Sequence, residues 1–264
     1  MGTNISKLVF QPPEPTYTKD PNLVWLRTQQ NEVIPAFFID NAKPFTLLFS
    51  HGNAEDLGMI IGYFREVSQI LDVNVFAYEY TGYGMSTGVP NEKGLYADIE
   101  AAYTYLTNII GVSWSQIILY GRSLGSGPSV HLATKYPVRA VVLQSPVLSA
   151  YRVAFNFRFT LPGDMFANID KIGKLRCPVY IIHGTKDEIV PYWHGKDLYK
   201  QSRHPVEPFW VDGGGHNNLE IMARGPFYER FMEFLRTLET LPIPAELEAQ
   251  AAEVLPEHPS AAAC

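Results

Sequence analysis

Ile117-Ile118-Leu119-Tyr120-Gly121-Arg122-Ser123-Leu124-Gly125 is the stretch that decides the fold. The aliphatic run before Gly121 predicts a buried strand, and the residues from Ser126 onward predict the start of a helix. A Gly-x-Ser-x-Gly pattern between strand and helix is typical of a sharp turn that holds its serine on a strained backbone above the sheet edge. Glycine is needed two residues to either side because a side chain there would collide with the neighbouring helix and strand. Ser123 is therefore the candidate nucleophile.

Apolar runs of strand length alternate with segments of helical spacing along the rest of the chain. Strands are expected at 33–39, 45–50, 74–80, 140–143, 179–182 and 209–211, and helices at 55–71, from Asn91 to Leu106, from Ser126 to Tyr136 and at 219–241. This alternation predicts the α/β class, with a mostly parallel central sheet covered by helices on both faces. Sheets of this kind carry their chemistry at the carboxyl ends of their strands.

The 264 residues are enough for one large domain, and no internal repeat or second domain is visible. We expect an extended N-terminal segment over residues 1–17, one domain over 18–241 and a disordered tail over 242–264, which is rich in Ala, Glu and Pro. An aromatic insertion at about 147–170 breaks the alternation, and we call it the cap. Two interpretations stay open for the cap: a connection packed on the core, or apolar surface for an acyl chain.

Composition excludes several classes of function. The net charge of −6 and the absence of any basic run give no support to a nucleic-acid partner. The two cysteines, Cys177 and Cys264, form neither a disulfide framework nor a zinc pattern, which favours a reducing, cytoplasmic location. The sequence contains no window of about 18 apolar residues, so no transmembrane helix is predicted. The seven histidines lack metal-ligand spacing, and the chemistry suggested by Ser123 calls for no metal and no organic cofactor.

A serine nucleophile needs a histidine to remove its proton and a carboxylate to hold that histidine. Asp187 directly follows the strand expected at 179–182, and His216 follows the next one, after three glycines. Serine, acid and histidine thus follow three strand ends in the chain order of one large hydrolase class. We predict Ser123 as nucleophile, Asp187 as acid and His216 as base.

Other residues compete for these roles. Glu188 is the alternative acid, for which we expect a solvated loop charge instead. His51 and His183 each lie at a strand end before a glycine, where packing and turn roles suffice. His131 falls inside the helix after Ser123 and is expected to be a core residue.

Acyl transfer places negative charge on the substrate oxygen, so backbone N–H donors must already point at it. Leu124, directly after the serine, is expected to supply one donor. The second is expected from the loop after the 45–50 strand, where Asn53 is the first choice and Ala54 the next. Because the donor is a backbone group, mutation of the Asn53 side chain need not abolish activity.

Six segments of the chain resemble those of a known family, namely Leu8–Tyr17, His51–Gly58, Gly121–Gly125, Phe166–Ile172, His183–Glu188 and Val206–Val211. Through these segments, the chain resembles the α/β-hydrolase domain-containing protein 17 family. The match runs from about residue 8 to 241. It implies an α/β-hydrolase fold with a short cap, in a membrane-attached serine hydrolase that removes palmitoyl groups from protein cysteines. S-palmitoylated proteins would then be the substrates, with Ser123, Asp187 and His216 as nucleophile, acid and base.

The chain departs from that family at its N-terminus. Animal members carry a palmitoylated N-terminal cysteine cluster, whereas this chain has no cysteine before Cys177. Met1-Gly2-Thr3-Asn4-Ile5-Ser6 instead fits the pattern for N-myristoylation of Gly2. We therefore expect a peripheral contact with the cytosolic face of membranes through Gly2.

Three functions are compatible with this sequence. The first is a hydrolase of long-chain acyl thioesters, acting as a protein S-depalmitoylase through an acyl-enzyme on Ser123. The second is a carboxylesterase or monoacylglycerol lipase with the same three residues, since nothing in such a triad distinguishes a thioester from an oxyester. The third is a non-catalytic hydrolase fold used for binding, against which the complete set of catalytic residue types argues.

Overall fold

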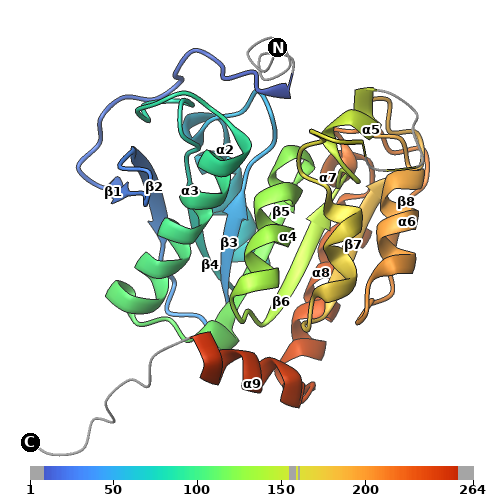
Figure 1. The fold of residues 1–264 in the computed structure, drawn as a ribbon. Coiled ribbons are helices and arrows are strands. Elements are labelled where there is room, and N and C mark those ends of the chain that lie inside the picture. Colours follow the sequence, from blue (N-terminus) through green and yellow to red (C-terminus); the bar gives the residue numbers. More distant parts are fainter. Residues whose placement is uncertain (1–8, 155–158, 160, 255–264) are drawn as a thin grey trace, which may run out of the picture.

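The computed structural model describes residues 9–154, 159 and 161–254. An eight-stranded sheet runs through its middle in the order β1-β2-β4-β3-β5-β6-β7-β8 (Figure 1). The strands are β1 Val24–Arg27, β2 Val33–Ile39, β3 Thr46–Ser50, β4 Asn74–Tyr78, β5 Ile117–Arg122, β6 Ala140–Gln144, β7 Val179–Gly184 and β8 Phe209–Val211. β1 and β2 are antiparallel to their neighbours, and every pairing from β4 through β3 to β8 is parallel. The parallel part therefore brings the carboxyl ends of six strands to one edge.

Helices cover both faces of this sheet. They are α2 Leu57–Ile70, α3 Glu92–Thr104, α4 Ser126–Lys135, α5 Ala150–Ala154, α6 Trp193–Gln201, α7 Leu219–Met222, α8 Arg224–Thr240 and α9 Ala245–Val254. Apolar residues of α3, α4 and α6 belong to one buried cluster, and those of α2 and α8 belong to another. The expected three-layer α/β architecture, with a mostly parallel sheet, is thus confirmed.

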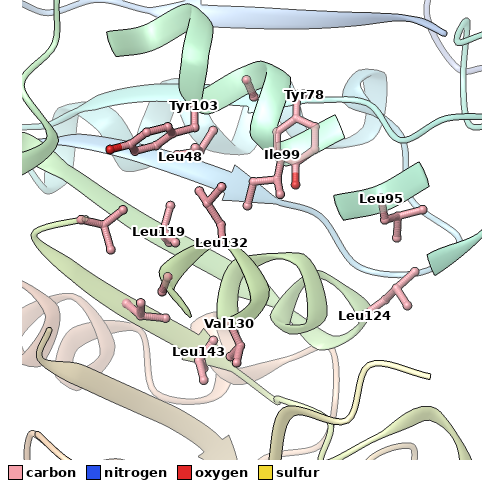
Figure 2. Close-up of a cluster of buried hydrophobic side chains, with 14 of the residues drawn as sticks. Leu48, Tyr78, Leu95, Ile99, Tyr103, Leu119, Leu124, Val130, Leu132 and Leu143 are labelled. Atoms are coloured by element: carbon pink, nitrogen blue, oxygen red, sulfur yellow. The ribbon is translucent and has the colours of Figure 1, made fainter. Parts of the chain in front are cut away.

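The two buried clusters share the central strands by alternation. In β5, Ile117 and Leu119 belong to the cluster under α3 and α4, whereas Ile118 and Tyr120 belong to the cluster under α8. Figure 2 shows Leu119 and neighbouring side chains of the first cluster packed between the sheet and the two helices. Each of these four β5 side chains is at most 1% exposed, and burial of an aliphatic side chain contributes about 1.5–3 kcal/mol.

Side-chain caps fix the starts of two helices at the sheet's carboxyl edge. Asn91, the expected cap, accepts a hydrogen bond from Gly94 N at 2.9 Å at the start of α3. Asp56 caps α2 by accepting from Met59 N at 3.0 Å. The same carboxylate also accepts from the backbone N and the hydroxyl of Thr16, at 2.6 and 2.5 Å. The N-terminal segment is thereby fastened to the loop before α2.

Two elements differ from the sequence-based expectation. β1 was not predicted, because its four residues alternate too briefly to be told from a loop. The closing helix expected over 219–241 is broken at Ala223 into α7 and α8. Pro226 explains the break, since proline has no N–H and is tolerated only in the first turn of a helix.

The prediction of a disordered tail over 242–264 is wrong for its first part, which forms α9. Leu247 of this helix is 1% exposed and joins the cluster under α3 and α4. Glu246 pairs with His204 at 2.8 Å and with Arg203 at 2.7 Å. The composition argument failed because it cannot register the specific contacts, such as those of Leu247, Glu246 and the buried Gln250, that dock a short Ala-rich helix on the domain. Residues 255–264 lie outside the described residues.

The cap begins with the short helix α5 and returns to the core at Phe166. Phe166 is fully buried, and its ring lies 5.9 Å from that of Phe10 and 5.8 Å from that of Tyr96. Phe159, in contrast, is 61% exposed. Of the two interpretations, core packing describes the Phe166 end, and exposed apolar surface describes Phe159. Among the described helices, none is long and apolar enough to cross a bilayer.

Candidate active site

The backbone between β5 and α4 forms the sharp turn that the sequence predicts. Ser123 has a φ of +52°, a left-handed conformation that is costly for a residue with a side chain. A Cβ on Gly125 would lie 2.0 Å from the carbonyl oxygen of Ser50, at the end of β3. A Cβ on Gly121 would lie 2.5 Å from the carbonyl oxygen of Gly125. Both glycines are thus required by close approach, and the turn lifts Ser123 out of the strand.

The structure brings the three predicted catalytic residues together at the carboxyl ends of β5, β7 and β8. His216 Nε2 lies 2.9 Å from Ser123 Oγ, and His216 Nδ1 lies 2.8 Å from Asp187 Oδ2. All three residues are at most 9% exposed. With Nδ1–H donated to the carboxylate, Nε2 is free to accept the serine proton. This arrangement can activate a serine hydroxyl.

Asp187 is held as an ionised carboxylate. Its Oδ1 accepts from the backbone N–H groups of Ile189 and Val190, at 3.0 and 2.8 Å. Burial by itself raises the pKa of Asp187, but the hydrogen bonds from His183, His216 and Val190 outweigh burial and hold that pKa well below its ordinary value. The charge that stabilises a protonated His216 is therefore present throughout the neutral range.

His183 contacts the Asp187 carboxylate, whereas only packing and turn roles were expected for it from the sequence. His183 Nε2 lies 3.2 Å from Asp187 Oδ2 and 2.9 Å from Val190 O. A Cβ on Gly195 would lie 2.5 Å from His183 Nδ1, so α6 packs directly against the ring. The position of His183 at the end of β7, four residues before the acid, was the available signal.

The remaining competitors lie apart from the serine. Glu188 Oε2 accepts from the backbone N of His216 at 3.3 Å, which supports the histidine loop rather than the imidazole. His131 stacks on Tyr96 with ring centroids 3.6 Å apart. Burial, followed by nearby Lys135 and Lys171, lowers the pKa of His131 to about 3, so this histidine is neutral.

The loop after β3, residues 51–56, carries the expected second oxyanion donor and is tightly fixed. Asn53 Oδ1 accepts from Gln11 N at 3.0 Å and from the Tyr83 hydroxyl at 2.7 Å, while Asn53 Nδ2 donates to Val9 O at 2.8 Å. Within the described part of the chain, the backbone N–H of Asn53 has no hydrogen-bond acceptor. This N–H is thus available, whereas the side chain ties the loop to the N-terminal segment.

An ion pair also joins this loop to the serine turn. Arg122, directly before the serine, forms a salt bridge with Glu55, whose second oxygen accepts from Gly52 N at 2.8 Å. Burial by itself raises the pKa of Glu55, but Arg122 outweighs it and the pKa is lowered. Glu220 of α7 lies 3.9 Å from the other end of the guanidinium. Sequence reasoning missed this connection, because the three residues meet only through neighbouring strand ends.

Among the described residues, no group of three or more His, Cys, Asp or Glu side chains is placed to hold a metal ion. Of the predicted sites, Leu124 lies in the first turn after Ser123, as expected for the first oxyanion donor. Gly2, the predicted lipidation site, lies outside the described residues.

Solved structures with a similar fold identify the fold class. An esterase of Pyrococcus furiosus superposes with a TM-score of 0.70 at 19% identity, covering 86% of this chain and 98% of the esterase. An α/β serine hydrolase homologue from Coxiella burnetii gives a TM-score of 0.62 at 19% identity, covering 83% and 100%. The fold is therefore that of an α/β hydrolase.

Relatives in sequence narrow the class to a family. The chain is 42% identical over 265 residues to human α/β-hydrolase domain-containing protein 17B, covering 89% of this chain and 91% of the relative. It is 45% identical over 212 residues to protein 17C of Xenopus laevis, covering 79% and 68%. No family model matches the chain. The chain belongs to the α/β-hydrolase domain-containing protein 17 family.

Proposed function

We propose that this protein is a serine hydrolase that cleaves long-chain acyl thioesters, with palmitoylated cysteines of proteins as its substrates. The observation that carries the proposal is the continuous set of contacts from Ser123 Oγ through His216 to Asp187, at 2.9 and 2.8 Å. No other described histidine contacts Ser123 Oγ, and Asp187 contacts the ring nitrogen opposite to the serine.

Acylation begins when His216 Nε2 takes the proton of Ser123 Oγ as this oxygen attacks the thioester carbonyl. The carbonyl oxygen becomes an oxyanion, and the N–H groups of Leu124 and Asn53 donate to it. When the tetrahedral intermediate collapses, the C–S bond breaks and the proton on His216 passes to the leaving cysteine sulfur. The products of this half-reaction are the free cysteine thiol and an ester on Ser123.

Deacylation repeats these steps with water. His216 removes a proton from a water molecule, whose oxygen attacks the ester carbonyl, and the same two N–H groups stabilise the second oxyanion. Collapse returns the proton to Ser123 Oγ and releases the fatty acid. Asp187 keeps its negative charge throughout and stabilises the imidazolium in both halves.

Exposed apolar side chains near the catalytic loops support a lipid-bearing substrate. Ile189, two residues after Asp187, is 51% exposed, and Ile221 and Met222 of α7 are 80% and 56% exposed. Phe159 of the cap is also exposed. Side chains of this kind lower the free energy of an acyl chain by about 0.8 kcal/mol for each CH₂ group that they remove from water. The family membership supports a hydrolase, and the thioester substrate is part of this proposal.

The experiment measures fatty-acid release from an S-palmitoylated cysteine peptide and from a monoacylglycerol, side by side, with the Ser123→Ala variant as control. We expect faster release from the peptide thioester, lost in the variant. Preference for the glycerol ester would instead make the protein a lipase or carboxylesterase with the same three residues. Failure of folded wild-type protein to react with a fluorophosphonate probe would favour the non-catalytic function.

Membrane attachment is a separate proposal. We propose that myristoylation of Gly2 places the enzyme at the cytosolic face of membranes, where palmitoylated proteins lie. One myristoyl chain gives only reversible binding, so the protein would exchange between membrane and cytosol. Membrane and soluble fractions of cells expressing wild type and the Gly2→Ala variant test this proposal. We expect the variant to leave the membrane fraction, and a wild type already confined to the soluble fraction would contradict the anchor.

A further inference from the structure

A buried histidine–carboxylate pair lies at the start of the loop that carries the expected second oxyanion donor. His51 is the residue after β3, and Glu79 is the residue after β4, the strand beside it. Both side chains are 0% exposed, and His51 Nε2 lies 2.8 Å from Glu79 Oε1. This ion pair is the contact that compensates both atoms, since neither has an aligned hydrogen-bond partner among the described residues.

The second ring nitrogen of His51 is also occupied. Nδ1 lies 2.8 Å from the carbonyl oxygen of Gly52, which can only accept, so Nδ1 carries a proton. Because Nε2 faces a carboxylate, protonation of His51 at both ring nitrogens is favoured. Burial by itself lowers the pKa of His51, but Glu79, Gly52 and Glu55 outweigh burial and raise it above the ordinary value. The ring is also flanked by Tyr80, with centroids 3.9 Å apart.

Glu79 is itself anchored and is not a free counter-ion. Its second oxygen accepts from the Tyr17 hydroxyl at 2.9 Å and from Leu57 N at 3.1 Å. A Cβ on Gly84 would lie 2.4 Å from that oxygen, so the backbone encloses the carboxylate. The Tyr80 hydroxyl donates to the carbonyl oxygen of His51 at 2.6 Å. The imidazole is thus held from both its ring and its backbone.

The contact with Gly52 O fixes the direction of the Asn53 N–H. The described chain contains no cis peptide bond, and in a planar trans peptide the C=O and the following N–H point in opposite directions. Holding Gly52 O on the side of His51 therefore aims the Asn53 N–H away from that ring. The N–H of Gly52 already donates to Glu55, so it does not compete for the oxyanion.

We propose that His51, held by Glu79, is a positioning residue that orients and polarises the Gly52–Asn53 peptide as an oxyanion donor. The proposal rests on the serine-hydrolase function proposed above and adds a second histidine to it. A hydrogen bond from an imidazolium to the carbonyl oxygen is charge-assisted, and it makes the opposite N–H of the same peptide a better donor. A fixed donor needs no reorganisation when the oxyanion forms.

The first test uses the wild-type protein and requires no activity. In protein with ¹⁵N-labelled imidazoles, the His51 ring nitrogens are assigned by comparison with the His51→Asn variant. We expect both nitrogens to carry protons at neutral pH. A bare Nδ1 would overturn the proposal, because a bare nitrogen cannot donate to Gly52 O. If the wild type hydrolyses no acyl substrate, the proposed function fails, while this measurement still decides the state of His51.

The second test compares turnover per active site, counted by titration with a fluorophosphonate. We expect His51→Ala to lower kcat about 10- to 100-fold with KM within about twofold, because the lost interaction acts in the transition state. His51→Asn keeps a neutral amide donor, so it should recover part of the loss. The affinity of a trifluoromethyl ketone, whose adduct with Ser123 carries an oxyanion, should fall in parallel with kcat.

Glu79→Gln keeps the volume of Glu79 and removes its charge, and we expect it to lower kcat per active site by less than His51→Ala does. Glu100→Gln is the matched control, since Glu100 lies 3.6 Å from the neutral His131 and forms a salt bridge with Lys135 at 2.7 Å, on helices α3 and α4. The control should keep the wild-type kcat. A merely structural role would lower the thermal midpoint and the fraction of active protein in the His51 variants. Unchanged kcat per active site in His51→Ala would then overturn the proposal.

Discussion

Two histidine–carboxylate pairs lie on either side of Ser123, and only one of them contacts it. His216 is paired with Asp187 and has its second nitrogen on Ser123 Oγ. His51 is paired with Glu79 and has its second nitrogen on a backbone carbonyl. Under the proposed function, a carboxylate partner is therefore not sufficient to make a histidine a base. The group at the opposite nitrogen decides whether the proton can move to a substrate or stays in place.

Removal of the transferring histidine is expected to have the largest effect. His216→Ala should lower kcat by about 10⁵- to 10⁶-fold, because no other described histidine lies against Ser123 Oγ to accept its proton. Turnover of a thioester peptide checks this, with His51→Ala measured beside it. Equal losses in the two variants would contradict the division of roles between the pairs.

The second-largest loss of kcat is expected when Asp187, the partner of His216, is neutralised. Asp187→Asn should lower kcat by about 10⁴-fold, because an amide at this position favours the wrong tautomer of His216. KM should change little. Turnover of the same peptide at saturating and limiting concentration separates the two constants, and a loss confined to KM would be inconsistent with a role in proton transfer.

The pH dependence of stability should have opposite signs for the two pairs. The folded pKa of Asp187 lies below the unfolded value of about 3.9, so its stabilisation is fully present above about pH 4 and is lost as pH falls through the folded pKa. The folded pKa of His51 lies above the unfolded value of about 6.5, so its stabilisation is fully present below about pH 6.5 and is lost as pH rises through the folded pKa.

Urea unfolding of wild type, Asp187→Asn and Glu79→Gln between pH 3 and pH 9 measures this. The free energy of unfolding of wild type minus that of Asp187→Asn should shrink toward acid pH. The same difference for Glu79→Gln should shrink toward alkaline pH. Two differences that change in the same direction would show that His51 is not a charged partner of Glu79.

The smallest change in kcat is expected for Glu188, the residue after Asp187. Glu188→Gln should change kcat by no more than about threefold, because a glutamine oxygen can still accept the backbone N–H of His216. Measured with Asp187→Asn, this variant separates two adjacent carboxylates. A loss as large as that of Asp187→Asn would mean that Glu188, and not its neighbour, is the acid.

The sequence by itself determined the parts of this protein that depend on short stretches of chain. The apolar runs predicted seven of the eight strands, and the Gly-x-Ser-x-Gly pattern predicted a turn whose glycines a Cβ would block. The chain order of Ser123, Asp187 and His216 indicated that they would meet. These inferences succeed because hydrophobic periodicity and glycine requirements are local, and because parallel strands gather their carboxyl ends at one edge.

Only the tertiary structure decided which neighbours each polar group has. His51 and Glu79 are 28 positions apart and meet because β3 and β4 are adjacent, so their carboxyl ends bring both side chains behind one loop. Docking of α9 likewise depends on distant contacts, because Leu247 packs in the cluster under α3 and α4 and Glu246 pairs with His204. The physical reason is the same in both cases. Whether a charge or a leucine is buried, and which groups contact it, depends on its surroundings, and those surroundings come from distant parts of the chain.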